Sequence, residues 1–485
     1  MRTLVCMLVC LSLFGRWAGV CLAQAQAQTP SALLEKGIGL LKQGRTAEAL
    51  DALRAAAKAG PTDPDCLAWL GYALVEAGKA DEALPVLRSA AAARPKDANI
   101  LNNLASAYIA KGRYKDAQAV CRQALQVQPQ LHQARYNLGL ALVRMGRHAE
   151  AVAELSKLTA ARPGDPDAYS LLGQALAGSK RKWEAMKAYR RAAQLEPGNS
   201  RRWEELAAAY KEIGLAKDAF AALRRASDLT PREYATAAAA AEAGEEAGDV
   251  KASAELWKRA QLAKPTDPLP HARRARLLVR LGDYSGAEQE YREALRLGYS
   301  NAETINNIGW ALFQQGRHKE ALEWFRKALS AGGAVIEAKR NVAACYEVMG
   351  DTSACASAWR DVVAADPKDA DAWRRLGHAL LKLGRNQEAE AAWAAAVKLE
   401  PGNASAWNGL GIARQRRGDL AGAEQAYRRA IAADPKLASA HNNLGTVYEK
   451  RGDNRKAAEA YRTALKLEPN NAEARANLSR VTQRG

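Results

Sequence analysis

The sequence is poor in the residues that build metal sites and disulfide frameworks. It has 7 cysteines in 485 residues, and three of them, Cys6, Cys10 and Cys21, fall in the first 21 positions. The other four are too few for a disulfide scaffold. The 6 histidines include no two that stand three or four residues apart, which excludes a histidine pair for metal on one helix face. We expect neither a metal nor a cofactor.

Aromatic residues make up only 6% of the chain, but the apolar fraction of 48% is ordinary for a globular protein. This fraction excludes a collagen-like or wholly disordered chain. Positive charge dominates, because 71 Lys and Arg residues outnumber 53 Asp and Glu residues and give a formal net charge of +18. Beyond the first 27 residues, no stretch resembles a membrane span.

The first 27 residues have the order of a secretory signal peptide, which is charged, then apolar, then small. Arg2 precedes an apolar run that reaches Phe14, and small residues follow up to Ala27. The run is shorter than the ~20 residues of a membrane-spanning helix. We therefore expect export, either to the periplasm or out of the cell. An uncleaved anchor, lipidation at Cys21 and association with the outer membrane are the alternatives.

The rest of the chain repeats itself every 34 residues. Glycines at this spacing, doubled where Lys180 intervenes, mark position 15 of each repeat: Gly44, Gly78, Gly112, Gly146, Gly214, Gly248, Gly282, Gly316, Gly350, Gly384, Gly418 and Gly452. The frame gives thirteen uninterrupted repeats over 30–471, namely 30–63, 64–97, 98–131, 132–165, 166–199, 200–233, 234–267, 268–301, 302–335, 336–369, 370–403, 404–437 and 438–471. Residues 472–485 begin a further helix, expected over 472–481, which caps repeat 13 with Arg475 and Arg480 facing solvent.

Other positions of the repeat predict a pair of antiparallel helices. Position 8 is Gly or Ala in all thirteen repeats, and positions 20 and 27 are Ala in eleven each, so the two helices can approach closely. Large residues at positions 4, 7, 11 and 24 fill the space between them. Gly at position 15 ends the first helix, and Pro at position 32 ends the second. Acidic residues at position 19 begin the second helix, where the helix dipole favours them.

This pattern resembles the tetratricopeptide repeat family throughout residues 30–471. The resemblance implies an all-α fold, a right-handed superhelical solenoid of thirteen helix-turn-helix repeats plus a capping helix. It also implies a concave groove lined by positions 2, 5, 6, 9, 12 and 13 of the first helices. Repeat 7 (234–267) has Ala237, Ala240 and Gly244 at core positions, so we expect a softer joint there, with a thinner but ordinary repeat as the alternative.

Asparagines recur at positions 5 and 6, so the groove is expected to present a row of amide groups. These groups either hold an extended peptide backbone or serve local packing. The row is similar to the groove in the repeat domain of protein O-GlcNAc transferases, although residues such as Trp69, Glu205 and Arg273 interrupt it. The candidate binding residues here are Asn102, Asn103, Tyr136, Asn137, Asn306, Asn307, Asn341, Asn408, Asn442 and Asn443.

Aromatic and basic residues add to the candidate site. Trp310 and Phe313 in repeat 9 are expected to point into the groove together, as a hot spot for peptide or sugar. Arg273, Arg276 and Arg374 bring positive charge to the same face. A basic stripe follows position 25 of the second helices, which is Arg or Lys in eleven repeats. It either attracts acidic glycans or is a solvated face with local acidic partners, and we favour the second interpretation.

Catalytic signals are lacking, because no phosphate loop and no nucleophile–base pair can be assigned. We therefore expect no enzyme activity. Cys345 and Cys355 occupy positions 10 and 20 of one repeat. Two buried thiols are favoured there over a disulfide.

These features predict a non-catalytic scaffold that binds protein partners through its groove in a bacterial cell-envelope complex. Two alternatives stay open. One is an accessory protein that binds an acidic polysaccharide, through its basic surface, or serves exopolysaccharide export. The other is a regulatory repeat subunit of a separate glycosyltransferase. No nucleic acid is expected, and membrane contact is expected only through an N-terminal tether.

Overall fold

The structure, a computed structural model, describes residues 29–332 and 335–483. These residues form 27 helices, α2 to α28, and no strand, which confirms the predicted all-α fold. The predicted signal peptide lies outside the described residues. Among the helices of the described ranges, none is both long enough and apolar enough to cross a membrane.

The described residues divide into two compact units, with the boundary in sequence between Ala247 and Gly248. Unit 1 precedes this boundary and unit 2 follows it, and each is described by itself. The first helices of unit 1 are α2 (Pro30–Lys42), α4 (Pro64–Glu76), α6 (Ala98–Ala110), α8 (His132–Arg144), α10 (Pro166–Gly178), α12 (Ser200–Glu212) and α14 (Tyr234–Ala247). Its second helices are α3 (Thr46–Ala59), α5 (Ala80–Ala93), α7 (Tyr114–Val127), α9 (His148–Ala161), α11 (Lys182–Leu195) and α13 (Ala216–Leu229).

Unit 2 continues the alternation of first and second helices. Its first helices are α16 (Pro268–Arg280), α18 (Ala302–Gln314), α20 (Val335–Met349), α22 (Ala370–Lys382), α24 (Ala404–Arg416), α26 (Ala438–Lys450) and the capping helix α28 (Ala472–Gln483). Its second helices are α15 (Val250–Ala263), α17 (Tyr284–Arg296), α19 (His318–Ser330), α21 (Thr352–Ala365), α23 (Asn386–Leu399), α25 (Leu420–Ala433) and α27 (Asn454–Leu467).

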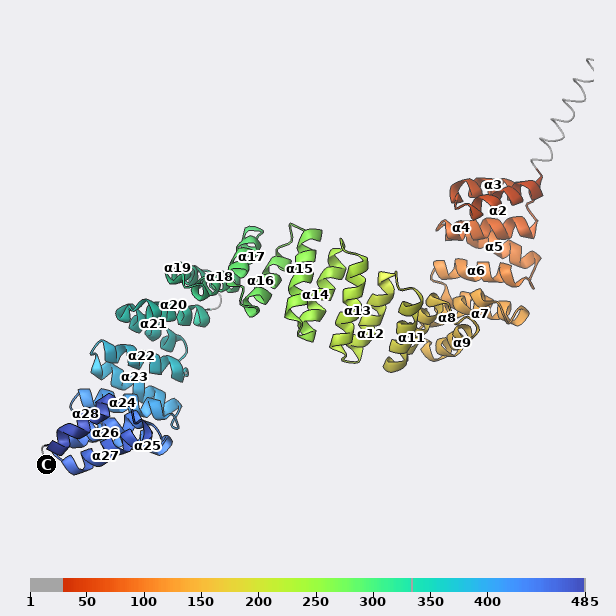
Figure 1. The fold of residues 1–485 in the computed structure, drawn as a ribbon. Helices are drawn as coiled ribbons and strands as arrows, with labels where there is room; N and C mark the ends of the chain where they lie inside the picture. Colours follow the sequence, from red (N-terminus) through yellow and green to blue (C-terminus); the bar gives the residue numbers. More distant parts are fainter. Residues whose placement is uncertain (1–28, 333–334, 484–485) are drawn as a thin grey trace, which may run out of the picture. The chain divides into compact units, whose positions relative to one another are not determined.

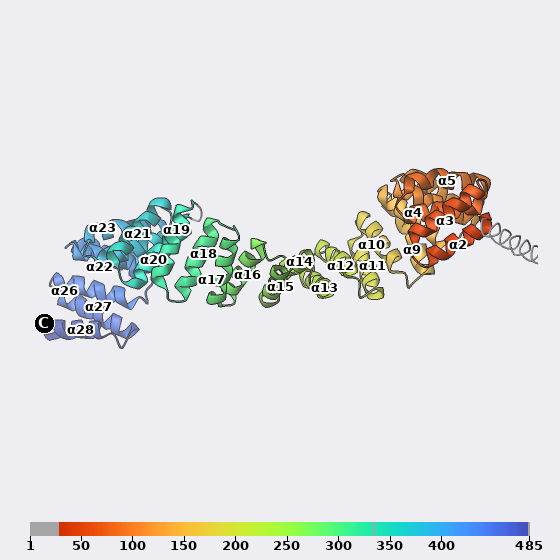
Figure 2. The same ribbon diagram turned by 90° about the horizontal axis from the view of Figure 1, so that it is seen from above.

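Within each unit, the helices pack in the order in which they occur in the chain (Figures 1 and 2). A second helix contacts the first helix of its own repeat and the first helix of the next one, as α5 contacts α4 and α6. Successive first helices also touch, as α4 touches α6. Each unit is therefore an all-α solenoid in which a repeat packs mainly on its neighbours.

The two helices of a repeat come close together where position 8 meets position 24. In repeat 9, a Cβ atom added to Gly309 would lie 2.7 Å from Cε1 of Phe325. In repeat 13, a Cβ atom on Gly445 would lie 2.6 Å from Cε1 of Tyr461. Both aromatic side chains are fully buried. These distances leave no room for a larger side chain at position 8, as the sequence predicts.

The turn between the two helices needs a left-handed backbone at position 15. The glycines there have positive φ angles, from 68° at Gly112 to 84° at Gly418. Lys180 takes this position in repeat 5 and also has a positive φ of 62°. Since a β-carbon is crowded in this region, Lys180 is held in a strained conformation that glycine would adopt freely.

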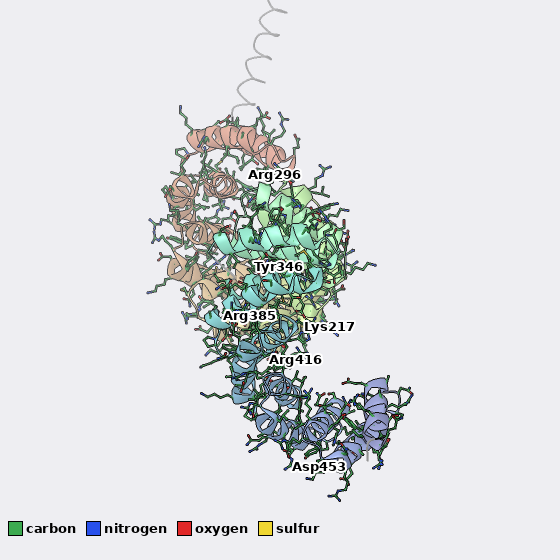
Figure 3. All side chains as sticks on the ribbon, turned by 90° about the vertical axis from the view of Figure 1, so that its left-hand side faces the viewer. Lys217, Arg296, Tyr346, Arg385, Arg416 and Asp453 are labelled. Carbon is green, nitrogen blue, oxygen red and sulfur yellow. The ribbon has the colours of Figure 1, made fainter. Side chains whose placement is uncertain are left out.

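In eleven of the thirteen repeats, position 16 is Asp or Arg and starts the second helix in one of two ways. Where it is Asp, the carboxylate caps the helix, as Asp453 Oδ1 accepts a hydrogen bond from the backbone N–H of Lys456 at 3.1 Å. Where it is Arg, the guanidinium pairs with an acidic residue at position 19, as Arg385 Nε does with Glu388 Oε1 at 2.7 Å. Arg385 and Asp453 are labelled in Figure 3. Where position 16 is Arg, the acidic residue at position 19 thus forms an ion pair with it and is also favoured by the helix dipole.

The ends and the middle of the array differ from the other repeats. In α28, Ala474, Asn477 and Val481 are buried. Its Arg480 Nε donates to Glu449 Oε1 at 2.6 Å, and its Arg475 Nη2 donates to the carbonyl of Pro469 at 2.7 Å. Both arginines therefore bond α28 to repeat 13.

In α14, the small core residues Ala237, Ala240 and Gly244 are buried. The boundary between the two units falls in this same repeat. The softer joint at repeat 7 stays a prediction.

The strained turn of repeat 5 gives a first prediction. K180G should raise the free energy of unfolding by about 0.5–1 kcal/mol, because glycine has no β-carbon to crowd in the left-handed region. Denaturant titration followed by circular dichroism measures the change. The matched control is G146A at the same position of repeat 4, which should lower stability by a similar amount. Equal stability of K180G and the parent chain would contradict this account.

Four cysteines lie in the described residues, and all are buried free thiols: Cys66, Cys121, Cys345 and Cys355. Burial raises the pKa of Cys121 and of Cys345 to about 12. The thiolate is the reactive form of cysteine, so these thiols should be inert in the folded chain.

We expect iodoacetamide to spare these four thiols in the native chain at about pH 8 and to label all four after unfolding without reductant, as read by peptide mass spectrometry. Cys345 and Cys355 that stayed unlabelled after unfolding would reveal a disulfide between them.

An unfolded thiol loses its proton at lower pH than the buried Cys121 does, so the free energy of unfolding should fall once the pH rises above about 9.

Candidate functional site

The candidate site is the surface formed by positions 2, 5, 6, 9, 12 and 13 of the first helices, which we call the first-helix face. The asparagines of this face link one repeat to the next. Position 6 of one repeat donates from Nδ2 to Oδ1 at position 5 of the preceding repeat. The pairs are Asn137 to Asn102 (2.9 Å), Asn341 to Asn306 (3.0 Å), Asn443 to Asn408 (3.0 Å) and Asn477 to Asn442 (3.1 Å).

These links favour local packing, one of the two roles expected for the amide row. Asn102, Asn137, Asn306 and Asn442 are at most 9% exposed, and the amide of each is bonded to an asparagine of a neighbouring repeat. Local packing therefore accounts for them. Other polar residues use the same place between repeats, because Ser170 Oγ donates to Glu205 Oε2 at 2.6 Å where the row is interrupted.

The remaining predicted residues of the row are half-buried. Asn341, Asn408 and Asn443 belong to the links just described, and Asn103 lines a hollow in unit 1 that is described below. Burial raises the pKa of Tyr136, so its phenol keeps its proton. Arg374 donates from Nη2 to Asp371 Oδ1 on its own helix at 2.7 Å.

In unit 2, the structure brings three predicted residues together around a hollow of about 210 Å³. Arg273 and Arg276 on α16 line it with Asn307 on α18 and Tyr291 on α17. Asn307 Nδ2 donates to the hydroxyl of Tyr291 at 3.3 Å. Burial raises the pKa of Tyr291 to about 12, so the phenol stays neutral and can donate. Guanidinium, amide and phenol donors together suit the carbonyl or carboxylate oxygens of a ligand.

Trp310 lies on the same helix as Asn307, three residues further on, and is 36% exposed. Its ring stacks on Phe313, with centroids 5.8 Å apart and planes 9° from parallel. Phe313 is half-buried, packs against the core of unit 2 and meets the edge of His318 at 4.9 Å. Trp310 therefore presents part of its ring to solvent, and Phe313 packs between this ring and the core of unit 2.

The sequence did not predict a larger hollow in unit 1. It has a volume of about 620 Å³ and is lined by residues of α2, α4 and α6, among them Trp69, Tyr72 and Asn103. Trp69 and Tyr72 are 37% and 36% exposed. The available signal was the pair of aromatic residues at positions 6 and 9 of repeat 2, where Trp69 interrupts the asparagine row.

The basic stripe at position 25 also links repeats. Where the next repeat has Tyr at position 11, the arginine donates to its hydroxyl: Arg88 to Tyr108 (3.0 Å), Arg190 to Tyr210 (2.9 Å), Arg428 to Tyr448 (3.1 Å), and Arg326 to Tyr346, which is labelled in Figure 3. Three arginines that face a repeat with Leu at position 11 pair with its Glu at position 19: Arg54 with Glu82 (2.7 Å), Arg122 with Glu150 (3.2 Å) and Arg360 with Glu388 (2.8 Å). Local partners thus account for these seven cations.

A third hollow, of about 410 Å³, lies between α7, α8 and α9. Its Glu154 accepts hydrogen bonds from Arg135 and Lys157, each at 2.7 Å. Burial alone would raise the pKa of Glu154, but these two cations outweigh it and lower the pKa. The charges of this hollow are therefore matched from within. Nowhere in the described ranges do three His, Cys, Asp or Glu side chains form a group that could hold a metal ion.

The asparagine links give a prediction for stability. N341A should lower the free energy of unfolding by about 1–3 kcal/mol, because it leaves the buried Oδ1 of Asn306 without its donor. The matched control is N103A, which removes an asparagine at the same position that makes no such link and should cost less than about 0.5 kcal/mol. Equal losses in both variants, measured by denaturant titration, would argue against a structural role for the links.

Comparison with known proteins identifies the repeats. Family profiles described as tetratricopeptide repeat match more than half of the chain, at residues 40–107, 74–130, 108–175, 166–199, 273–335, 346–389, 374–438 and 438–471. No match was found among curated proteins.

Solved structures of repeat proteins are similar to parts of the chain. The C-terminal part of a TPR repeat-containing protein from Cytophaga hutchinsonii is 16% identical, with a TM-score of 0.45, over 51% of this chain and 99% of its own. MamA from Desulfovibrio magneticus RS-1 is 24% identical, with a TM-score of 0.33, over 34% of this chain and 94% of its own. The pilF protein of Pseudomonas aeruginosa is 24% identical, with a TM-score of 0.37, over 42% of this chain and 92% of its own.

Proposed function

Because this chain belongs to the tetratricopeptide repeat family, we propose that it is a non-catalytic scaffold that holds protein partners in a bacterial cell envelope. The repeats themselves support a role in protein–protein interaction. The envelope setting and the lack of catalysis are the parts of the proposal that go further than the family. Their support comes from the charged, apolar and small order of residues 1–27, and from an array of repeats that fills the described chain.

One observation carries the proposal, namely the hollow around Tyr291 beside the exposed ring of Trp310. Asn307 and Trp310 are three residues apart on α18, so they share one side of that helix. A peptide laid along this face would meet hydrogen-bond donors at Arg273 and Asn307 and an apolar surface at Trp310. Such a pairing of an exposed aromatic anchor with nearby polar groups is typical of hot spots in protein interfaces.

An acidic glycan on the basic stripe receives less support from the geometry. Seven arginines of the stripe are bonded to tyrosine or glutamate of the next repeat, so binding a polymer there would disrupt contacts that join repeats. The polysaccharide and glycosyltransferase alternatives are therefore kept as outcomes of the experiment below.

The experiment is a pull-down from solubilised envelope extract with the purified chain, at low and high salt. We expect a discrete protein partner that persists at high salt, because groove contacts depend less on long-range charge than a basic surface does. The double variant W310A/R273A should capture at least about fivefold less of it, since both changes fall at the proposed anchor. Circular dichroism of each variant verifies that it folds.

The matched control is W183A, which removes a tryptophan that is 58% exposed on the second helix α11. Its capture of the partner should equal that of the parent chain. Recovery of acidic polymer alone, released by salt and indifferent to W310A/R273A, would replace the proposal with the polysaccharide alternative. A partner that proves to be a glycosyltransferase would instead favour the regulatory-subunit alternative.

A further inference from the structure

The hollow around Trp69 and Tyr72 in unit 1 is lined by residues of three successive first helices. α2 contributes Ile38 and Leu41, α4 contributes Trp69 and Tyr72, and α6 contributes Ile100. Its volume of about 620 Å³ makes it about three times as large as the hollow around Tyr291. Its walls are about equally apolar and polar, so a ligand there would remove apolar surface from water and also meet hydrogen-bonding groups.

The two aromatic rings form a corner. The ring centroids of Trp69 and Tyr72 are 5.8 Å apart, and the rings stand at 85° to each other. Each side chain is more than one third exposed, so both present ring surface to solvent. Rigid rings of this kind offer a large contact area at a low cost in side-chain entropy.

The carboxylates that line the hollow are already bonded. Asp65 accepts two hydrogen bonds from Arg94, at 2.7 and 2.8 Å. Asp97 accepts from the backbone N–H groups of Asn99 at 2.9 Å and Ile100 at 3.1 Å, as the cap of α6. Both carboxylates are therefore already engaged by groups within unit 1.

Several hydrogen-bond donors of this hollow, in contrast, have no partner among the described residues. Within residues 29–332 and 335–483, no hydrogen-bond partner is found for the indole N–H of Trp69, the hydroxyl of Tyr72 or Nζ of Lys42, three residues that line the hollow. The side-chain amides of Asn99 and Asn103, which also line it, are likewise without a partner in these ranges. An indole N–H and an ammonium group can only donate. An amide can accept as well as donate, but the unpartnered groups together hold more donors than acceptors, so they favour a ligand that is richer in acceptors than in donors.

We propose that this hollow binds a proline-rich segment of a partner protein in the polyproline II conformation. Each proline has a carbonyl acceptor but no backbone N–H, which matches the free donors of Trp69, Tyr72 and Lys42. Pro-rich segments dock in grooves lined by aromatic rings, and their conformation is set before binding. The inference rests on the proposed function, because it takes the first-helix face as the surface that binds partners.

Other ligands fit this chemistry less well. A lysine- or arginine-rich segment would meet Lys42, while the carboxylates Asp65 and Asp97 are occupied. A sugar presents hydroxyl groups that donate as well as accept, so it needs free acceptors beside the aromatic rings. A glycan is therefore an outcome that the experiment has to separate from a peptide.

The probe is an uncharged decaproline peptide, titrated into the purified chain by isothermal calorimetry. We expect saturable binding with a dissociation constant below about 1 mM. W69A should weaken it at least about tenfold, because both the ring and the N–H are lost. W69F keeps a ring without the donor and Y72F keeps the ring without the hydroxyl, and each should weaken binding about threefold to tenfold.

The matched control is W183A, an exposed tryptophan on the second helix α11, which should leave decaproline binding unchanged. A Gly-Ser peptide of the same length should not bind. Absence of decaproline binding, equal binding by W69A and the parent chain, or preferential binding of a chito-oligosaccharide would each overturn the inference. If a partner is captured through Trp310 but decaproline does not bind, only this inference fails. Decaproline binding without any captured partner would leave it standing and remove the wider proposal.

Discussion

The contact between a small residue at position 8 and a large one at position 24 sets how close the helices of a repeat can come. In repeat 11, a Cβ atom on Gly377 would lie 2.7 Å from Nε1 of Trp393. A Cβ atom on Gly409, in the next repeat, would lie 2.5 Å from Cε2 of the same ring. One large side chain thus fixes both the spacing within a repeat and the spacing to its neighbour. Every other regular contact of the array depends on these two spacings.

The sequence predicted the parts of the fold that depend on local requirements. A left-handed turn favours glycine, so the glycines at position 15 predicted the ends of the first helices correctly. Small residues at position 8 likewise predicted the close approach of the helices.

The links between repeats were not predicted, because they depend on how one repeat is rotated against the next. The bond from Asn341 to Asn306 joins residues 35 apart, and the bond from Arg326 to Tyr346 joins residues 20 apart. Neither spacing is a period of a helix.

The candidate site was predicted in part for a similar reason. Arg273 and Asn307 hold position 6 in adjacent repeats, so the 34-residue period was enough to bring them to one hollow. In the sequence, Trp69 is only an interruption of the asparagine row, so the sequence does not predict the aromatic corner that Trp69 and Tyr72 form in unit 1. The value of Trp69 depends on the exposure of its ring and on which neighbours are already bonded, and these are properties of the packed array.

The interruptions of the asparagine row are where the array keeps chemistry free for a ligand. An asparagine at position 6 donates a hydrogen bond to the preceding repeat wherever position 5 of that repeat is also asparagine, as Asn137 and Asn443 do. Each hollow on the first-helix face has a different residue at position 6 of one repeat, Trp69 or Arg273, followed in the next repeat by an asparagine that makes no such link, Asn103 or Asn307. Regular residues hold the repeats together, so a change at one irregular position can alter binding without weakening the frame. Specificity in such an array should therefore reside in departures from its own consensus.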